Sequence, residues 1–352
     1  MHKPTAERRA TLEMQNPTAE RRATLEMQNP TAERRATLDM QNPTAERRAT
    51  LMRTHWPSMA SLLGCATESP CGTVTLNSVP QLFPRFVKDL LVASPRVLIL
   101  RAPGTNCDAE TAFAFEQVGA ITNSIHVNQL IEDPRLGAGY QILCLPGGFS
   151  YGDDIAAGRI LAQRLSIHLR DLVEELRGDG RLVLGICNGF QVMMRLGIFF
   201  PGLEKSPPAT LAHNQQARFE DRWVHLVNHN SNSVFLKDVE RMYLPIAHAE
   251  GRLVFCPDAD IASLQSHGQL GLRYCNPTGL SGDEPLPFPG NPNGAALNVA
   301  GISDPSGRVF GLMPHPERYI DPTQHPFWTR EKSLPEHGQG RKVFENAVNF
   351  FH

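Results

Sequence analysis

Short apolar segments alternate with amphipathic segments along residues 95–200. The apolar segments are rich in Val, Ile and Leu, which is typical of strands buried on both faces of a parallel sheet. We expect such strands at residues 96–101, 121–127, 140–145 and 182–186. Helices are expected between them, at residues 109–118, at 155–177 as one long or two broken helices, and after residue 187. This alternation predicts an α/β fold with a mostly parallel sheet, helices on both faces and ligands at the carboxyl ends of the strands.

The pattern changes after residue 202. Residues 217–228 partly alternate between apolar and polar positions, as in an antiparallel strand. Residues 295–302 and 309–313 are expected to form two further strands, joined by the turn sequence Asp-Pro-Ser-Gly at 304–307. The sequence therefore predicts an added antiparallel portion, closed by an amphipathic helix at residues 341–351.

The beginning of the chain carries a tandem repeat. The unit PTAERRATLEMQN occurs three times within residues 4–42, once with a single change, and a truncated copy begins at Pro43. Its period is shorter than the ~20 residues of a solenoid unit, and successive helical copies would face different directions. We predict that residues 1–52 are disordered or conditionally helical, with an interaction arm as the alternative. Residues 53–94 are then a linker, and 95–352 form the ordered domain.

The composition argues against several classes of protein, namely nucleic-acid-binding, membrane, secreted and metal-binding proteins. The 352 residues are 41% hydrophobic and 20% charged, with a formal net charge of −2. This is ordinary for a globular protein and gives no reason to expect nucleic acid or an anionic membrane as a partner. No apolar run approaches the ~20 residues that span a bilayer, and no signal peptide is visible. The seven cysteines are scattered and odd in number, which favours a reducing cytoplasm, and none is spaced for a metal site.

The sequence Gly-Ile-Cys-Asn-Gly-Phe-Gln at residues 185–191 joins a strand directly to a helix. Such a junction holds its turn residue in a tight conformation, and Gly185 and Gly189 remove side chains that would collide around Cys187. The helix dipole favours the thiolate of Cys187, and the backbone N–H of Asn188 would point at an oxyanion formed beside it. A lone Cys is more often a small buried apolar residue. The two glycines and the strand–helix junction favour a nucleophile instead.

A glycine-rich loop, Pro-Gly-Gly-Phe-Ser-Tyr-Gly-Asp-Asp at residues 146–154, follows the third predicted strand. One interpretation is a plain turn, and another is a phosphate cradle, although the loop has neither the Walker pattern nor G-x-G-x-x-G. In the third interpretation, bare backbone N–H groups near Gly148 complete an oxyanion hole with Asn188. Glycine permits the close backbone approach that this requires.

A candidate base and an orienting acid follow the last predicted strand, in the sequence Pro-His-Pro-Glu-Arg at residues 314–318. A lone His is more often structural than catalytic, but two prolines stiffen the loop around His315. Residues two apart lie on one side of extended backbone, so Glu317 can orient the imidazole of His315 and stabilise its protonated form. A Cys, a His and an acid are the parts of a covalent acyl-transfer site, so Cys187, His315 and Glu317 are the candidate catalytic residues.

Four motifs, in order along residues 95–352, resemble those of class I glutamine amidotransferases. They are GTNCD at 104–108, PGGFSYGD at 146–153, GICNGFQ at 185–191 and MPHPER at 313–318. The forms FSYGD and GICNGFQ are similar to one branch, the glutaminase subunits of phosphoribosylformylglycinamidine synthase. The chain departs from that branch at Ala249, where the family segment would carry Gly, and this leaves the local backbone open.

The resemblance implies a flavodoxin-like class I amidotransferase domain that hydrolyses L-glutamine with this triad. The ammonia would convert formylglycinamide ribonucleotide to formylglycinamidine ribonucleotide in de novo purine (IMP) biosynthesis. ATP and Mg are expected on a partner synthetase subunit, with a small accessory subunit in the complex, and no cofactor is expected in this chain. Beyond the triad and the oxyanion donors, the resemblance implies glutamine-binding residues at Gly147, Phe149 and Gln191, and substrate or interface residues at His248 and Glu250.

Three alternatives stay open at this point. A glutaminase serving GMP, CTP or carbamoyl phosphate synthesis is the nearest, and FSYGDD and GICNGFQ argue against it. A cysteine hydrolase or chaperone is the second alternative, from related α/β folds whose cysteine lies in the same kind of strand–helix turn. Such a protein would not need the MPHPER segment. A non-catalytic scaffold would use the repeat array as its working part. Cys107, after the first predicted strand, is the rival nucleophile, but it lacks the paired glycines.

Overall fold

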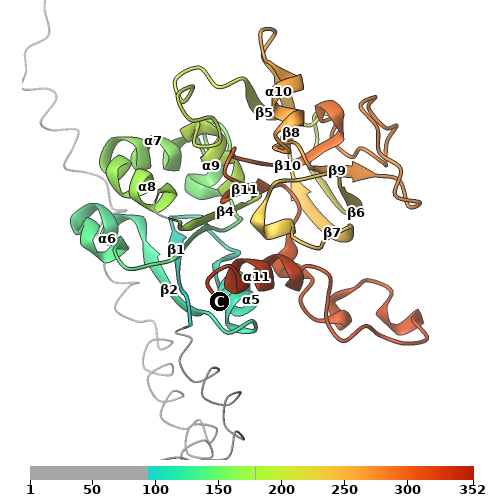
Figure 1. Cartoon of the computed structure of the whole chain (residues 1–352), viewed down its shortest axis with the longest axis horizontal. Helices are drawn as coiled ribbons and strands as arrows, with labels where there is room; N and C mark the ends of the chain where they lie inside the picture. The colour runs from blue at the N-terminus through green and yellow to red at the C-terminus, as the bar shows by residue number, and fades with distance from the viewer. Residues whose placement is uncertain (1–93, 179) are drawn as a thin grey trace, which may run out of the picture. The chain divides into compact units, whose positions relative to one another are not determined.

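The computed structural model describes residues 94–178 and 180–352. The predicted repeat array at residues 1–52 and the predicted linker, except its last residue, lie outside the described residues and stay predictions. Within the described part, no helix is long and apolar enough to cross a membrane. This part contains one nine-stranded sheet, one two-stranded sheet and the helices around them (Figure 1).

The large sheet joins a parallel half to an antiparallel half. Its strands are β1 (Arg96–Arg101), β2 (Ile121–His126), β3 (Ile142–Leu145), β4 (Leu182–Ile186), β6 (Glu220–Asn228), β7 (Arg241–His248), β9 (Leu272–Cys275), β10 (Val299–Ser303) and β11 (Val309–Leu312). They lie in the order β2-β1-β3-β4-β11-β10-β9-β6-β7. The first five are parallel neighbours, and the pairings from β11 to β7 are antiparallel. The predicted α/β fold with an added antiparallel portion is confirmed.

Helices cover both faces of the parallel half. They are α5 (Asp108–Glu116), α6 (Val127–Glu132), α7 (Arg159–His168), α8 (Arg170–Arg177), α9 (Asn188–Leu196) and α11 (Arg341–Asn349), with α10 (Ile261–Ser266) in the antiparallel half. Figure 1 shows α7, α8 and α9 on one side of the sheet and α5 and α11 on the other. The small sheet pairs β5 (Ala209–His213) with β8 (Glu250–Phe255) and lies beside α9.

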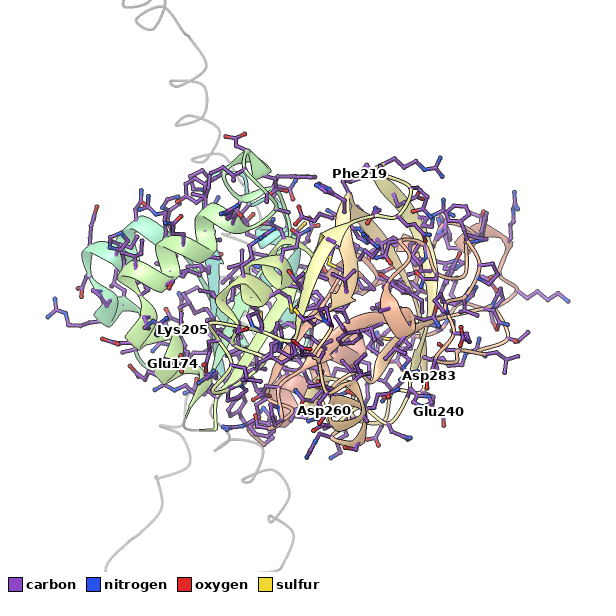
Figure 2. The ribbon with its side chains drawn as sticks, turned by 90° about the horizontal axis from the view of Figure 1, so that it is seen from above. Glu174, Lys205, Phe219, Glu240, Asp260 and Asp283 are labelled. Carbon is purple, nitrogen blue, oxygen red and sulfur yellow. The ribbon has the colours of Figure 1, made fainter. Side chains whose placement is uncertain are left out.

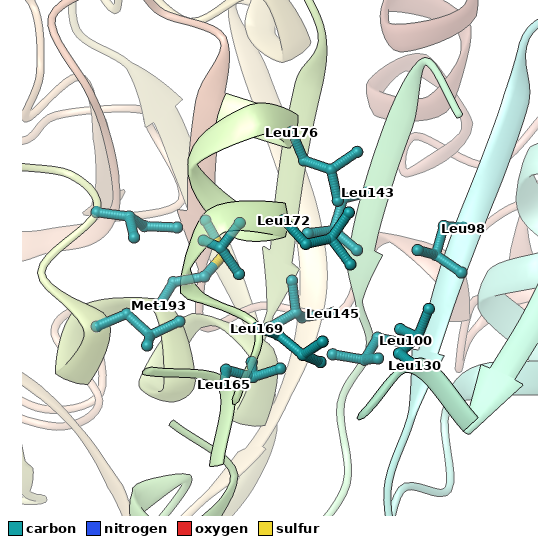
Figure 3. A pocket seen from close by; sticks show the side chains of 13 residues that line it. Leu98, Leu100, Leu130, Leu143, Leu145, Leu165, Leu169, Leu172, Leu176 and Met193 are labelled. Atoms are coloured by element: carbon teal, nitrogen blue, oxygen red, sulfur yellow. The ribbon is translucent and has the colours of Figure 1, made fainter. Parts of the chain in front are cut away.

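The core is apolar throughout the parallel half. Leu98, Val183 and Phe310 are at most 1% exposed. A cavity of about 20 Å³ lies between the sheet and helices α7 and α8, and Figure 3 shows that leucines such as Leu98 and Leu172 line it. This volume is about that of one water molecule, and none of the described residues that line the cavity has a polar side chain to hold one, so the cavity is a packing gap.

Two predicted elements differ from the structure, and one strand was not predicted. Of the two forms expected for residues 155–177, the two broken helices are confirmed, because the backbone of Leu169 leaves the helical region, but the first helix begins only at Arg159. The strand expected from residue 295 begins at Val299, because Leu297 and Asn298 adopt left-handed backbone conformations. The hydrophobic pattern did not predict strand β7, which contains Pro245. Proline is tolerated there because β7 is the edge strand of the sheet.

The parallel strands bring four loops to one edge of the sheet. Strand β1 leads to Cys107, β3 to the glycine-rich loop, β4 to Cys187 and β11 to His315. These strands are neighbours in the sheet, so residues more than 200 positions apart in the sequence meet at their carboxyl ends.

Candidate active site

Cys187 occupies a strained turn between β4 and α9. Its backbone has φ 50° and ψ −104°, a conformation that L residues rarely adopt. A Cβ at Gly185 would collide with Sδ of Met193, and one at Gly189 would collide with the carbonyl oxygen of Leu145. The backbone N–H of Cys187 donates to the Leu312 carbonyl at 2.8 Å. The two predicted glycines are therefore required by packing, and the turn has the form of a nucleophile elbow.

His315 and Glu317 form a buried pair. Nδ1 of His315 lies 2.6 Å from Oε1 of Glu317, and the two residues are 2% and 1% exposed. Burial opposes protonation of the imidazole, but the Glu317 carboxylate and the nearby thiols of Cys187 and Cys107 hold the pKa of His315 well above its usual value. With Nδ1 bound to Glu317, Nε2 is the nitrogen left for chemistry. Nε2 is buried and makes no hydrogen bond within the described residues.

The backbone at Gly148 fits the predicted oxyanion hole. Gly148 has φ 137°, and a Cβ there would lie 2.7 Å from both the amide nitrogen of Asn106 and the carbonyl oxygen of Gly104. Among the described residues, no acceptor pairs with the backbone N–H of Gly148 or with that of Asn188, the first residue of α9. Two unpaired donors at the ends of neighbouring strands are what an oxyanion hole requires.

A cavity of about 180 Å³ opens beside Cys187. This is several times the volume that one water molecule requires, so the cavity has room for a small metabolite. Six of the predicted site residues line it: Gly148, Phe149, Cys187, Gln191, His248 and Glu250. Four others do not, namely Gly147, Asn188, His315 and Glu317. Gly147 packs against His315, because a Cβ at Gly147 would lie 2.8 Å from Cε1 of His315.

A hydrogen-bond network fixes the glycine-rich loop to the elbow. The side-chain carbonyl of Asn188 accepts from the backbone N–H of Ser150 at 3.1 Å, and its amide donates to Asp153 at 3.1 Å and to Gln191 at 2.9 Å. Gln191 in turn donates to the carbonyl of Glu250. Gln191 therefore positions neighbouring chain segments while it lines the cavity.

The side chain of Glu250 is held by a partly buried ion pair. Its Oε1 lies 2.6 Å from Nη2 of Arg195, and its Oε2 accepts from the backbone N–H of Ala157 at 3.2 Å. No sequence pattern indicates Arg195, because the pair joins α9 to the start of β8. Ala249, where Gly was expected, lies outside the left-handed region, so the backbone accepts Ala there.

His248 is a neutral imidazole at the cavity wall. Its Nδ1 lies 3.1 Å from the side-chain oxygen of Asn214, and the Asn214 amide donates to two backbone carbonyls, so Nδ1 carries the proton. Burial, with the charge of His315 next in size and partly offset by Glu220, lowers the pKa of His248 to about 3. The side chain therefore offers an acceptor, and not a positive charge, at neutral pH.

Phe149 marks the mouth of the cavity. It is 44% exposed and its ring stacks on that of Phe219, with centroids 6.3 Å apart. Phe219 is 47% exposed and lies at the surface of the molecule (Figure 2). This pair leaves an aromatic surface beside the opening.

Cys107, the rival nucleophile, is placed differently from Cys187. It is 1% exposed, does not line the cavity and has φ −98° at the start of α5. Its Sγ accepts from Nη2 of Arg318 at 3.1 Å, and burial, ahead of the opposing His315 contact, raises the pKa of its thiol. Donor atoms of Cys107, His315 and Glu317 lie within 4.8 Å of one another, as in a metal site. The adjacent Arg318 guanidinium disfavours a cation at this position.

The chain is similar to a known protein family, to individual relatives and to a solved structure. Residues 94–351 match the model of a family described as the CobB/CobQ-like glutamine amidotransferase domain. The chain is 44% identical over 256 residues to phosphoribosylformylglycinamidine synthase subunit PurQ of Dehalococcoides mccartyi, covering 72% of this chain and 97% of the relative. The subunit PurQ of Methanococcus maripaludis strain C5 is 39% identical over 268 residues, covering 73% and 98%. A chain of the PurLQS structure from Thermotoga maritima superimposes with a TM-score of 0.55 at 29% identity, covering 74% of this chain and all of that one.

Proposed function

The chain belongs to the CobB/CobQ-like glutamine amidotransferase family, and on that premise we propose that it is the glutaminase subunit of a phosphoribosylformylglycinamidine synthase. It hydrolyses L-glutamine and supplies ammonia for the conversion of formylglycinamide ribonucleotide to formylglycinamidine ribonucleotide in purine biosynthesis. The relatives named PurQ, matched over nearly their whole length, support this substrate and product. The observation that carries the proposal is the elbow at Cys187, which opens to a small cavity and lies beside the buried His315–Glu317 pair.

The reaction begins with proton transfer from the thiol of Cys187 to Nε2 of His315. The thiolate attacks the side-chain amide carbon of glutamine, and the backbone N–H groups of Gly148 and Asn188 stabilise the oxyanion. His315, held by Glu317, protonates the departing nitrogen, which leaves as ammonia. Water, activated by His315, then attacks the γ-glutamyl thioester and releases glutamate and the free thiol.

The amidine chemistry lies on another subunit. The sequence lacks the Walker pattern of nucleotide-binding loops, which supports a division of labour in which a synthetase subunit binds ATP, Mg and the ribonucleotide. The structural relative comes from PurLQS of Thermotoga maritima, which supports assembly with a synthetase subunit and a small accessory subunit. No cofactor is required in this chain, because each step uses only its own side chains and backbone. The complex acts in the cytoplasm.

A glutamine-analogue electrophile tests the assignment of the nucleophile. The chain is incubated with 6-diazo-5-oxonorleucine, and the modified peptide is identified by mass spectrometry. Labelling is expected at Cys187 alone, and Cys107→Ser should be labelled as fast as the unmodified sequence. Labelling of Cys107 with Cys187 untouched would overturn the assignment. Absence of glutamine hydrolysis by the assembled complex would overturn the proposed function itself.

A further inference from the structure

One carboxylate in the wall of the cavity forms no ion pair with any of the described residues. Among the residues that line the cavity, only Asp153 and Glu250 carry carboxylates. Glu250 is neutralised by Arg195 at 2.6 Å and has both oxygens engaged. Asp153 forms no ion pair within residues 94–178 and 180–352. Among the described residues that line the cavity, Asp153 is therefore the carboxylate that no ion pair neutralises.

The two oxygens of Asp153 have different surroundings. Oδ1 accepts from the side-chain amide of Asn188 at 3.1 Å and from the backbone N–H of Gly158 at 3.3 Å. Within the described part of the chain, no hydrogen bond engages Oδ2. One oxygen is thus anchored to the elbow, through the residue that follows Cys187, and the other is left for a ligand.

The backbone that presents Asp153 is strained. Tyr151, Gly152 and Asp153 are three consecutive residues in the left-handed region, with φ of 56°, 72° and 54°. Left-handed backbone costs free energy at Tyr151 and Asp153, which have side chains. Strain of this kind persists where a residue must be held in a set position and clusters at functional sites.

The hydrogen bonds to the half-buried carboxylate of Asp153 do not fully offset the cost of burying its charge. Burial raises the pKa of Asp153, and the hydrogen bonds from Gly158 and Asn188 offset this only in part. A cationic group brought against Oδ2 would relieve this desolvation cost. Glutamine carries one cation, its α-ammonium, at the end of the molecule opposite the amide that Cys187 attacks.

We propose that Asp153 binds the α-ammonium of glutamine through Oδ2 and thereby selects the free amino acid over amides that lack an α-amino group. This proposal rests on the proposed glutaminase function and adds a specificity residue to it. A charge-assisted contact of this kind corresponds to about a 10- to 100-fold preference in kcat/KM. The ribonucleotide and ATP need no such contact, since they are bound elsewhere.

The test compares two substrates in the assembled complex, glutamine and glutaramic acid, which is glutamine without its α-amino group. Asp153→Asn keeps an oxygen for Asn188 and Gly158 and removes only the charge. We expect Asp153→Asn to lower kcat/KM for glutamine about 10- to 100-fold, mainly through KM, and to change kcat/KM for glutaramic acid little. Asp154→Asn, at the adjacent exposed residue outside the cavity lining, should change neither value.

Each outcome decides the proposal. Equal losses on both substrates would show a merely structural role for Asp153, and no loss on glutamine would show no role. If Asp153→Asn fails to fold, the unmodified complex alone still decides, since equal kcat/KM for glutamine and glutaramic acid would overturn the proposal. An unmodified complex that hydrolyses neither amide would instead contradict the proposed function.

Discussion

Nδ1 of His315 lies 2.6 Å from Oε1 of Glu317, and one short 3₁₀ turn carries both residues, with His315 at its N-cap. Neither side chain reaches solvent. The backbone N–H of His315 donates to the carbonyl of Pro245 in β7 at 2.8 Å, which fixes the loop that carries the pair. The imidazole is therefore held in one tautomer, with Nε2 left for the proton transfers at Cys187.

Glu317→Gln should lower kcat about 10²- to 10⁴-fold, with a smaller change in KM. An amide side chain can donate to Nδ1 and so favour the wrong tautomer of His315, and it no longer stabilises the imidazolium. Steady-state glutamine hydrolysis by the complex measures this. Glu345→Gln, whose carboxylate pairs with Arg341 on α11 at 2.7 Å away from the site, is the matched control and should leave kcat unchanged. A kcat within a factor of two of the unmodified value would remove Glu317 from the mechanism.

Gly148→Ala should lower kcat about 10²- to 10³-fold, the usual effect of losing one oxyanion donor. A Cβ at residue 148 would press on Asn106 and Gly104 at 2.7 Å and displace the loop from Cys187. Gly202→Ala separates this effect from backbone strain, because Gly202 also has a positive φ, of 82°, but open space around its Cβ position. Full activity of Gly148→Ala would show that the oxyanion donor lies elsewhere.

His248 should make the chain less stable as the pH falls below 6.5. The pKa of His248 is about 3 in the folded chain and 6.5 in the unfolded chain, so protons bind preferentially to the unfolded chain between these values. The loss is about 1.6 kcal/mol between pH 6.5 and pH 5, because the slope approaches its limit of ~1.4 kcal/mol per pH unit only below pH 6. Urea unfolding of the unmodified chain and of His248→Asn at both pH values measures the difference in slope. Parallel slopes would mean that His248 is charged, or accessible, in the folded chain.

Several parts of the site follow from local sequence. A strand that enters a helix at Gly-x-Cys-x-Gly indicates the elbow, because packing leaves no room for side chains at Gly185 and Gly189. The spacing of His315 and Glu317 predicts their contact, since both lie in one short loop. The parallel order of β1, β3, β4 and β11 then brings these loops to the same edge of the sheet.

Other parts depend on contacts that no local pattern indicates. Asp153 faces the cavity only because three left-handed residues bend the loop toward Asn188. Arg195 on α9 pairs with Glu250 on β8, although the two residues are 55 positions apart in the sequence. Strand β7 escaped prediction because Pro245 argues against a strand unless the strand lies at a sheet edge. In each case the local sequence does not show which distant segments come into contact in the folded chain.

The repeat array should be dispensable for catalysis. It contains no glycine-rich loop and no candidate nucleophile, and the family match begins only at residue 94. A chain that starts near residue 90 should fold and keep full activity with its partner subunits. Circular dichroism and glutamine-dependent turnover measure the two properties. Loss of either one would show that the array contributes to the domain.

The nitrogen source of the assembled complex tests the central claim, that Cys187 releases ammonia for use on another subunit. Formation of formylglycinamidine ribonucleotide is measured for the unmodified complex and for Cys187→Ala, with glutamine or with an ammonium salt. Cys187→Ala should abolish the glutamine-dependent reaction and leave the ammonium-dependent reaction largely intact, because the amidine chemistry does not use this site. Equal loss of both reactions would mean that Cys187 supports the structure and is not the nucleophile.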